Sequence, residues 1–204
     1  MSMRDPTPLA PEPGVLVQRL MAGDQSAFEI IFRTHYAKLA NYAKQLVRSP
    51  DAAEDVVQEV FVTLWAHRER LTAPDNLVAY LFRSVRNRGL NFLRQQRQVS
   101  AWQARQATIE PAESPAADQD AEHDEVDRAI KGAAASLSPR CREVFELSRD
   151  RGLTYRQIGE TLGISIKTVE TLMGRALKAI RIELGDLHPS RSGRASPRNA
   201  PDPR

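Results

Sequence analysis

This sequence has little of what disulfide-bonded proteins and most enzymes require. Cys141 is the only cysteine in 204 residues, so no disulfide bond can form within the chain, and this favours a cytoplasmic protein. The four histidines are scattered, and the sequence contains neither a His/Cys cluster with metal-ligand spacing nor a glycine-rich phosphate loop. We therefore expect a protein that is not an enzyme and has no catalytic residue, metal, cofactor or small-molecule substrate.

Long hydrophobic runs and strand patterns are also missing. No apolar stretch approaches the length that a membrane-spanning helix needs, so we expect no membrane insertion. Apolar and polar residues do not alternate over any sustained stretch, whereas apolar spacings of three and four residues are frequent. The expected fold class is therefore all-α. Residues 1–13 have no apolar signal region and predict a disordered leader.

The net charge of +3 hides a strong segregation of charge along the chain. Residues 14–98 contain twelve basic and eight acidic side chains, and residues 128–187 contain eleven basic and seven acidic ones. Between them, residues 99–127 contain one basic and eight acidic side chains, a net charge of −7. Two basic blocks separated by an acidic strip indicate two modules that face nucleic acid, joined by a segment of different character.

The clearest motif lies in residues 153–184. Thr154 and Gln157 form an S/T-x-x-Q capping box that predicts the start of a helix, and Gly163 predicts its end. Ser165 is a suitable N-cap for a second, longer helix with apolar residues at helical spacing. Two helices around a tight glycine turn are typical of a helix-turn-helix. A plain pair of packed helices is the alternative, but the caps, the turn and the apolar positions all favour the helix-turn-helix.

The surface left open on the second helix suits DNA. Gly159, in the first helix, has no side chain and would let the backbones of the two helices approach each other closely. Glu170 is the one acid on the open surface: it could accept a hydrogen bond from a cytosine amino group, pair with Lys167, or remain solvated. The other side chains are polar or basic, as a helix in a major groove requires. The open set comprises Lys167, Thr168, Glu170, Thr171, Arg175 and Lys178.

Four helices are predicted in the N-terminal half. The apolar pattern places them at Val15–Met21, at Gln25–Arg48, from Pro50 with Ser49 as N-cap, and at Leu77 to about Gln98. The fourth helix has a stripe of basic and amide side chains, suited to a phosphate backbone and adjacent bases. No acid occurs within this stripe to pair with its arginines, which disfavours a surface laced by salt bridges. The stripe comprises Arg83, Arg86, Asn87, Asn91, Arg94 and Arg97.

The remaining segments have the composition of connections and tails. Residues 99–124 contain prolines, alanines and most of the acids, and predict a flexible acidic linker. Helices are expected to resume in residues 125–186, with Ser138 and Pro139 at the start of one of them. Residues 187–204 are rich in proline, serine and arginine and predict a disordered basic tail.

Both halves together resemble a known family. AFEIIFRTHYAKLANYA, AEDVVQEVFVTLW and AYLFRSVRNRGLNFLRQQRQ are similar to region 2 of the extracytoplasmic-function (ECF) sigma factors, small members of the bacterial sigma-70 family. LSPRCREVFELSRDRGLTYRQIGETLGISIKTVETLMGRALKAIR is similar to their region 4. The resemblance implies two small helical domains, region 2 at 14–98 and region 4 at 125–186. It also implies a subunit that directs promoter-specific transcription initiation, with core RNA polymerase, promoter DNA and an anti-sigma factor as partners.

The resemblance also implies roles for particular residues. The third helix would dock on core polymerase through Asp55, Gln58, Glu59, Val62 and Trp65, although Trp65 could equally fill the core. The fourth helix and the loop before it would meet the −10 element through Asn76, Arg83, Arg86, Asn87, Asn91 and Arg94. The helix-turn-helix would read the −35 element through Arg156, Ser165, Lys167, Thr168, Glu170, Thr171 and Arg175. The acidic linker would thread polymerase channels that otherwise hold nucleic acid, or act only as a solvated spacer.

The main alternative is a stand-alone regulator, because LTYRQIGETLGISIKTVET also resembles the LuxR-type helix-turn-helix. That alternative gives residues 25–97 no role.

Overall fold

The structure is a computed structural model that describes residues 13–71, 76–106, 132, 134 and 136–187. The predicted leader before Pro13, the linker after Gln106 and the tail after Leu187 lie outside the described residues. So does most of the helix expected after the linker, although Leu137 at its end is described and buried. Every regular element in the described ranges is helical, which confirms the all-α fold class.

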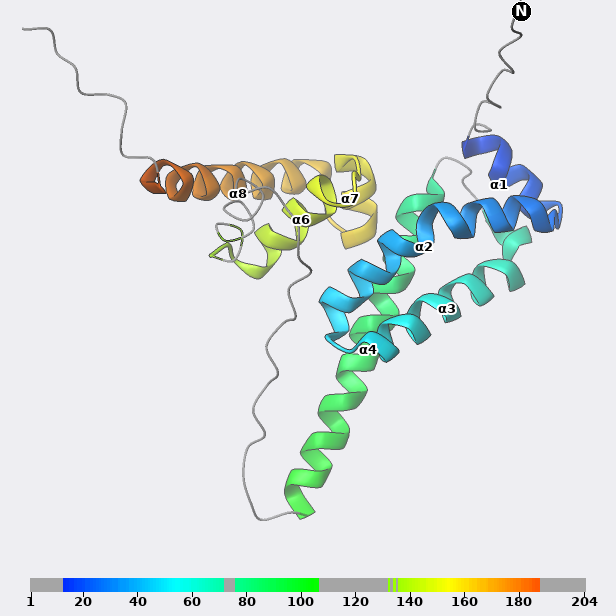
Figure 1. Ribbon diagram of the computed structural model, residues 1–204, viewed down its shortest axis with the longest axis horizontal. Coiled ribbons are helices and arrows are strands. Elements are labelled where there is room, and N and C mark those ends of the chain that lie inside the picture. The colour runs from blue at the N-terminus through cyan, green and yellow to red at the C-terminus, as the bar shows by residue number, and fades with distance from the viewer. Residues whose placement is uncertain (1–12, 72–75, 107–131, 133, 135, 188–204) are drawn as a thin grey trace, which may run out of the picture.

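The helices form two groups (Figure 1). In the N-terminal group, α2 packs against α1, α3 and α4; in the C-terminal group, α6, α7 and α8 pack against one another. The N-terminal elements are α1 (Pro13–Met21), α2 (Gln25–Val47), α3 (Pro50–Ala66), the 3-10 turn η1 (Arg68–Arg70) and α4 (Leu77–Gln106). The C-terminal elements are α6 (Pro139–Arg149), α7 (Tyr155–Leu162) and α8 (Ile166–Leu187).

The junction of α2 and α3 follows from its local sequence. Ser49 caps α3 by accepting a hydrogen bond from the backbone of Ala52, with Pro50 in the first turn, as predicted. Arg48 just before it has a φ of 56°, in the left-handed region, which a non-glycine residue rarely adopts. This residue ends α2 and reverses the chain, so α3 runs back along α2.

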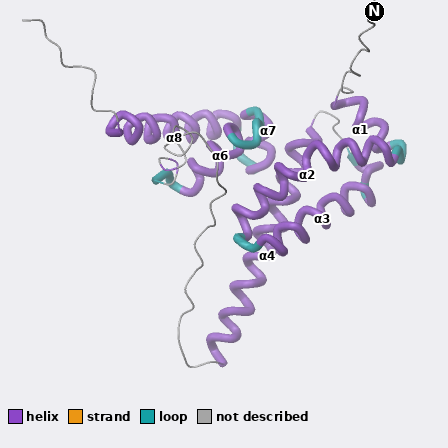
Figure 2. Tube along the Cα trace, in the orientation of Figure 1, coloured by secondary structure: helices purple, strands orange, loops and turns teal. Residues whose placement is uncertain are grey.

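The helix α4 is longer than the sequence pattern predicted. It continues past Gln98 to Gln106, because glutamine, arginine and alanine are good helix formers and the next proline is Pro111. Residues 94–102 are exposed, and this end of α4 projects away from the other helices (Figures 1 and 2). The first part of the predicted linker is therefore helical.

The two groups contact each other. The helix α7 packs against α4, and a single cluster of buried apolar side chains runs through both groups. Leu81 and Phe82 of α4 belong to this cluster, as do Val144 of α6 and Ile158 of α7. The surface of α4 that faces the C-terminal group is thus part of a shared core.

Candidate nucleic-acid interface

The helix-turn-helix has the local geometry that the sequence predicted. The Thr154 backbone N–H donates to Gln157 Oε1 at 2.9 Å, and the Gln157 backbone N–H donates to Thr154 Oγ1 at 3.3 Å, which completes the capping box. Gly163 ends α7 with a φ of 66°, and Ser165 Oγ accepts from the Thr168 backbone N–H at 3.1 Å. These local bonds fix where each helix begins and ends.

Gly159 sets how closely the turn approaches α7. A Cβ atom at this position would lie 2.8 Å from the backbone oxygen of Ile164, closer than real Cβ contacts come. The Ile164 backbone N–H also donates to the Gly159 oxygen at 2.9 Å, so the two backbones are held together. The predicted close approach is confirmed, and it holds the turn against α7.

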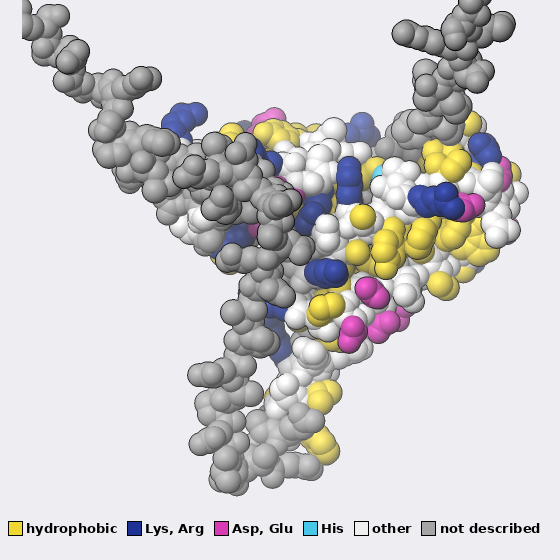
Figure 3. Space-filling model, viewed as in Figure 1, with side chains coloured by type: hydrophobic (Ala, Val, Ile, Leu, Met, Phe, Trp, Pro, Cys, Tyr) yellow, Lys and Arg dark blue, Asp and Glu magenta, His cyan; other side chains and the backbone are white. Residues whose placement is uncertain are grey.

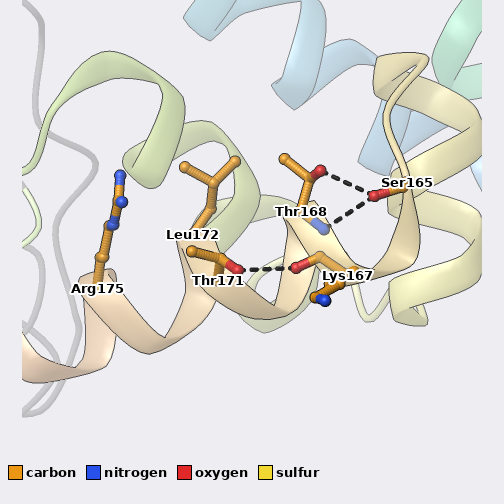
Figure 4. A pocket seen from close by; sticks show the side chains of 6 residues that line it. All are labelled: Ser165, Lys167, Thr168, Thr171, Leu172 and Arg175. Carbon is orange, nitrogen blue, oxygen red and sulfur yellow. Dashed lines mark hydrogen bonds between the residues drawn. The ribbon is translucent and has the colours of Figure 1, made fainter.

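The first turns of α8 form a shallow depression of about 300 Å³ (Figure 4). Thr168, Leu172 and Arg175 point to one side of the helix, and Thr171 Oγ1 donates to the Lys167 carbonyl at 2.9 Å. Hydroxyl, ammonium and guanidinium groups beside an apolar side chain can contact base edges, thymine methyl groups and phosphates. The depression is lined by Ser165, Lys167, Thr168, Thr171, Leu172 and Arg175.

Five of the seven residues predicted to read the −35 element line this depression, and two do not. Arg156 is on α7, exposed, and pairs with Glu160 one turn later at 3.3 Å. Glu170 is exposed on α8 outside the depression. Leu172, an apolar residue of α8, also lines the depression. Ile166, the first residue of α8, is 48% exposed.

The predicted −10 residues lie along α4 and at its start. Arg83, Asn87, Asn91 and Arg94 are exposed, and Arg94 Nη1 donates to Asn91 Oδ1 at 2.9 Å. Asn76, directly before α4, is half-buried. These side chains leave a row of guanidinium and amide groups open to a ligand.

Arg86 has an acidic partner, contrary to the sequence prediction. Its Nε donates to Glu143 Oε1 of α6 at 2.8 Å. Burial lowers the pKa of Arg86, but the hydrogen bond and negative charge of Glu143 outweigh this, so the net shift is upward. The acid lies 57 positions further along the chain, where an inspection of α4 alone could not find it.

The same carboxylate binds two more side chains. Glu143 Oε2 accepts from Arg140 Nη1 at 2.8 Å, and Oε1 accepts from the Tyr42 hydroxyl of α2 at 3.3 Å. Burial and the adjacent charge of Glu143 raise the pKa of Tyr42 well above its usual value, so the phenol stays a donor. We call Tyr42, Arg86, Arg140 and Glu143 the Glu143 network.

A second surface lies on α3. Asp55, Gln58, Glu59 and Val62 are all exposed, Val62 to 68% of its area, and they line one shallow depression. Figure 3 shows acidic side chains gathered over α3 beside a hydrophobic band. A carboxylate- and amide-rich surface around an exposed apolar side chain suits another protein better than it suits DNA.

Two residues beside this surface differ from expectation. Arg88 of α4, which the sequence did not single out, pairs with Glu59 and donates to Thr63 Oγ1 at 2.6 Å. Trp65 does not line the depression; its ring packs on Phe28 at 5.2 Å, with Arg68 over it at 4.6 Å. The position of Trp65 favours the core-filling alternative over direct docking.

Within the described ranges, no three His, Cys, Asp or Glu side chains are grouped so as to bind a metal ion. No helix there combines the length and apolar character needed to span a bilayer. The fold and site define an all-helical DNA-binding protein, with a helix-turn-helix in one group and an arginine- and asparagine-bearing helix in the other.

Comparisons with known proteins identify the family. Residues 31–99 match the model of sigma-70 region 2, and residues 127–180 match that of sigma-70 region 4. The chain is similar to the RNA polymerase sigma factor CarQ of Myxococcus xanthus, with 29% identity over 84% of this chain and 97% of the relative. It is 23% identical to the ECF RNA polymerase sigma factor SigK of Mycobacterium tuberculosis, over 88% of this chain and 97% of SigK.

A solved structure agrees with these matches. The sigma factor RpoE of Bartonella quintana, crystallised in complex with the anti-sigma factor NepR, superposes with a TM-score of 0.56 and 27% identity, over 77% of this chain and 96% of RpoE. The chain belongs to the sigma-70 family, as an ECF sigma factor. It binds core RNA polymerase and promoter DNA and directs transcription initiation. The region 2 match over α2 to α4 does not fit the alternative of a stand-alone LuxR-type regulator.

Proposed function

We propose that α8 reads the −35 element, α4 contacts the −10 element, and α3 docks on core RNA polymerase. The observation that supports this assignment is the depression on α8, where five predicted −35 residues share one surface. This surface follows the turn at Gly163 in the chain. Its hydroxyl and cationic groups match the donors and acceptors of a major groove. Region 2 would span residues 14–98 and region 4 residues 125–186.

The row of side chains on α4 suits DNA that is being opened. Asparagine amides can bind base edges, while arginines neutralise the phosphates. Arg83, Asn87, Asn91 and Arg94 are open in the structure, whereas Arg86 is bound to Glu143. We assign the four open residues, together with Asn76 and Arg86, to the −10 element.

The chain would act without chemistry of its own, in the cytoplasm, where bacterial polymerase and chromosome meet. Because RpoE is complexed with an anti-sigma factor, we propose that an anti-sigma factor also restrains this chain.

Transcription with purified components tests the assignment. Bacterial core RNA polymerase and fragmented genomic DNA are incubated with or without the full chain, and the RNA 5′ ends are sequenced. We expect new start sites at a small set of promoters only when the chain is present. An unchanged set of start sites would contradict the proposal.

Docking on α3 is tested by a pair of valine variants. Val62→Asp places a charge on the exposed α3 surface and should weaken binding to core polymerase at least tenfold. Val15→Asp, an exposed valine on α1, is the matched control and should bind as the wild type does. Equal affinity of both variants would remove this surface from the docking site.

A further inference from the structure

One apolar side chain lies among the polar groups of the depression on α8. Thr168, Leu172 and Arg175 follow one another at steps of four and three residues, so they share one face of the helix. Figure 4 shows the three side chains pointing to the same side. Thr168 and Arg175 are exposed, and Leu172 between them is half-buried and lines the depression. The surface that is proposed to face DNA therefore offers an apolar contact between a hydroxyl and a guanidinium.

Hydrogen bonds within the motif hold the hydroxyl groups around Leu172 in place. Ser165 Oγ and Thr168 Oγ1 lie 2.8 Å apart and share a hydrogen bond, and Thr171 Oγ1 donates to the Lys167 carbonyl. Because the Thr168 oxygen is turned to Ser165, its methyl carbon lies on the side of Leu172 (Figure 4). Leu172 and this methyl group thus form an apolar surface, which we call the Leu172 patch.

The hydrophobic core fixes the position of Leu172. The side chain packs against the buried cluster, to which its neighbours Val169, Met173 and Ala176 belong. Its remaining surface is open to the depression. A side chain held in this way loses little conformational freedom when a ligand binds, and contact with an apolar group removes its remaining surface from water. The Leu172 patch is therefore suited to bind an apolar group in one defined position.

The major groove of DNA presents one apolar group of matching size, the 5-methyl group of thymine. Guanine, adenine and cytosine present oxygen, nitrogen or amino groups there. A polar edge placed against the Leu172 patch would lose its hydrogen bonds to water and gain none, which is unfavourable. A methyl group has no hydrogen bond to lose, and it buries apolar surface. The Leu172 patch therefore favours thymine over the other three bases.

We propose that Leu172 is a specificity-determining residue of the −35 site, and that it binds the 5-methyl group of one thymine. This inference rests on the proposed function, because it names the base that the same surface of α8 selects. Leu172 and Arg175 lie about 4.5 Å apart along the helix axis, at about 1.5 Å per residue, and stacked bases are about 3.4 Å apart. The thymine therefore lies within about two base pairs of the nucleotide that Arg175 contacts.

Removing single methyl groups from the DNA tests this contact. Promoters are first mapped with core RNA polymerase and the full chain, and each thymine of the −35 element is then replaced by deoxyuridine, which lacks only the methyl group. We expect one replacement to weaken binding of the chain–polymerase complex about fourfold, the effect of one buried group of this size, while the others change it little. Promoters whose −35 elements share no A·T pair, or no position sensitive to the methyl group, overturn the inference.

Two variants at Leu172 connect the sensitive position with this residue. Leu172→Ala should bind the thymine and deoxyuridine promoters equally. Leu177→Ala is the control, because Leu177 is 47% exposed on the same helix outside the depression, and it should keep the full difference. Should Leu172→Ala unfold, Leu172→Gln keeps the length of the side chain without its apolar end and should also lose the difference. A Leu172 variant that still distinguishes the two promoters overturns the inference.

Methylated cytosine separates the methyl contact from the other features of thymine. At the sensitive position, the T·A pair is replaced by a C·G pair with or without a methyl group on the cytosine C5 atom. The wild type should bind the methylated pair more tightly, and Leu172→Ala should bind both pairs equally; equal binding by the wild type contradicts the contact. If start sites depend on the chain but no methyl group matters, only this inference is refuted. If no start site depends on the chain, the proposed function is refuted as well.

Discussion

Replacing Gly159 by alanine should destabilise the helix-turn-helix, although alanine is the better helix former. In an open helix position this change would gain about 0.5–1 kcal/mol. At Gly159 the new Cβ atom would lie 2.8 Å from the Ile164 backbone oxygen, and that backbone is held by its own hydrogen bond to Gly159. Overpacking of this kind costs about 1–3 kcal/mol. Because the new atom meets backbone and not a flexible side chain, the cost should lie near about 2–3 kcal/mol, and a helix gain of about 1 kcal/mol leaves a net loss of about 1–2 kcal/mol.

The assay is thermal and urea unfolding followed by circular dichroism. A loss of this size should lower the melting temperature by about 2–8 °C, at about 2–4 °C per kcal/mol for a chain of this length. Gly174→Ala is the matched control, because Gly174 lies on α8 and a Cβ there meets nothing within 4 Å among the described residues. It should stabilise by about 0.5–1 kcal/mol. If Gly159→Ala proved as stable as the wild type, the close approach would not be what sets the turn.

Three further predictions concern caps, pH and DNA. Thr154→Ala removes the side chain that caps α7 and should cost about 0.5–2 kcal/mol in urea unfolding; no change would mean that Gln157 alone suffices. Hydrogen bonds from Ser26 and Arg19 lower the pKa of Asp24 from 3.8 to about 2, so its stabilisation is present above pH 3.8 and lost as pH falls through about 2. Asp24→Asn should therefore lower the unfolding midpoint at neutral pH but not near pH 2, and an equal effect at both would contradict this cause. Arg175→Ala should weaken promoter binding by about 1–3 kcal/mol and relax discrimination at one base pair, measured by competition with variant duplexes; a uniform loss over all sequences would make Arg175 a phosphate contact.

The helix boundaries of the DNA-reading motif could be read from the sequence because they depend on neighbours. A cap bonds a side chain to a backbone group two or three residues away, as Thr154 with Gln157 and Ser49 with Ala52 show. The left-handed conformation of Gly163 is similarly a property of one residue. The length of α4 was underestimated because its exposed end has no apolar pattern, only residues that favour helix.

The candidate surfaces were partly predictable. Residues at helical spacing share a face, so the α8 depression and the exposed row on α4 followed from periodicity. The direction in which Trp65 packs could not be predicted from periodicity, because the aromatic and cationic side chains around it come from α2 and η1.

The sequence by itself determined two helical DNA-binding units and most of the residues that each turns outward, since caps and periodicity act over a few positions. Only the tertiary structure decided which charges meet. Arg88 pairs with Glu59, which lies 29 positions away in the sequence. Arg86 pairs with Glu143, which lies 57 positions away and belongs to the other unit. Coulomb attraction depends on the distance between the charges in space and on their shielding from water. Neither quantity can be predicted from the order of residues along the chain.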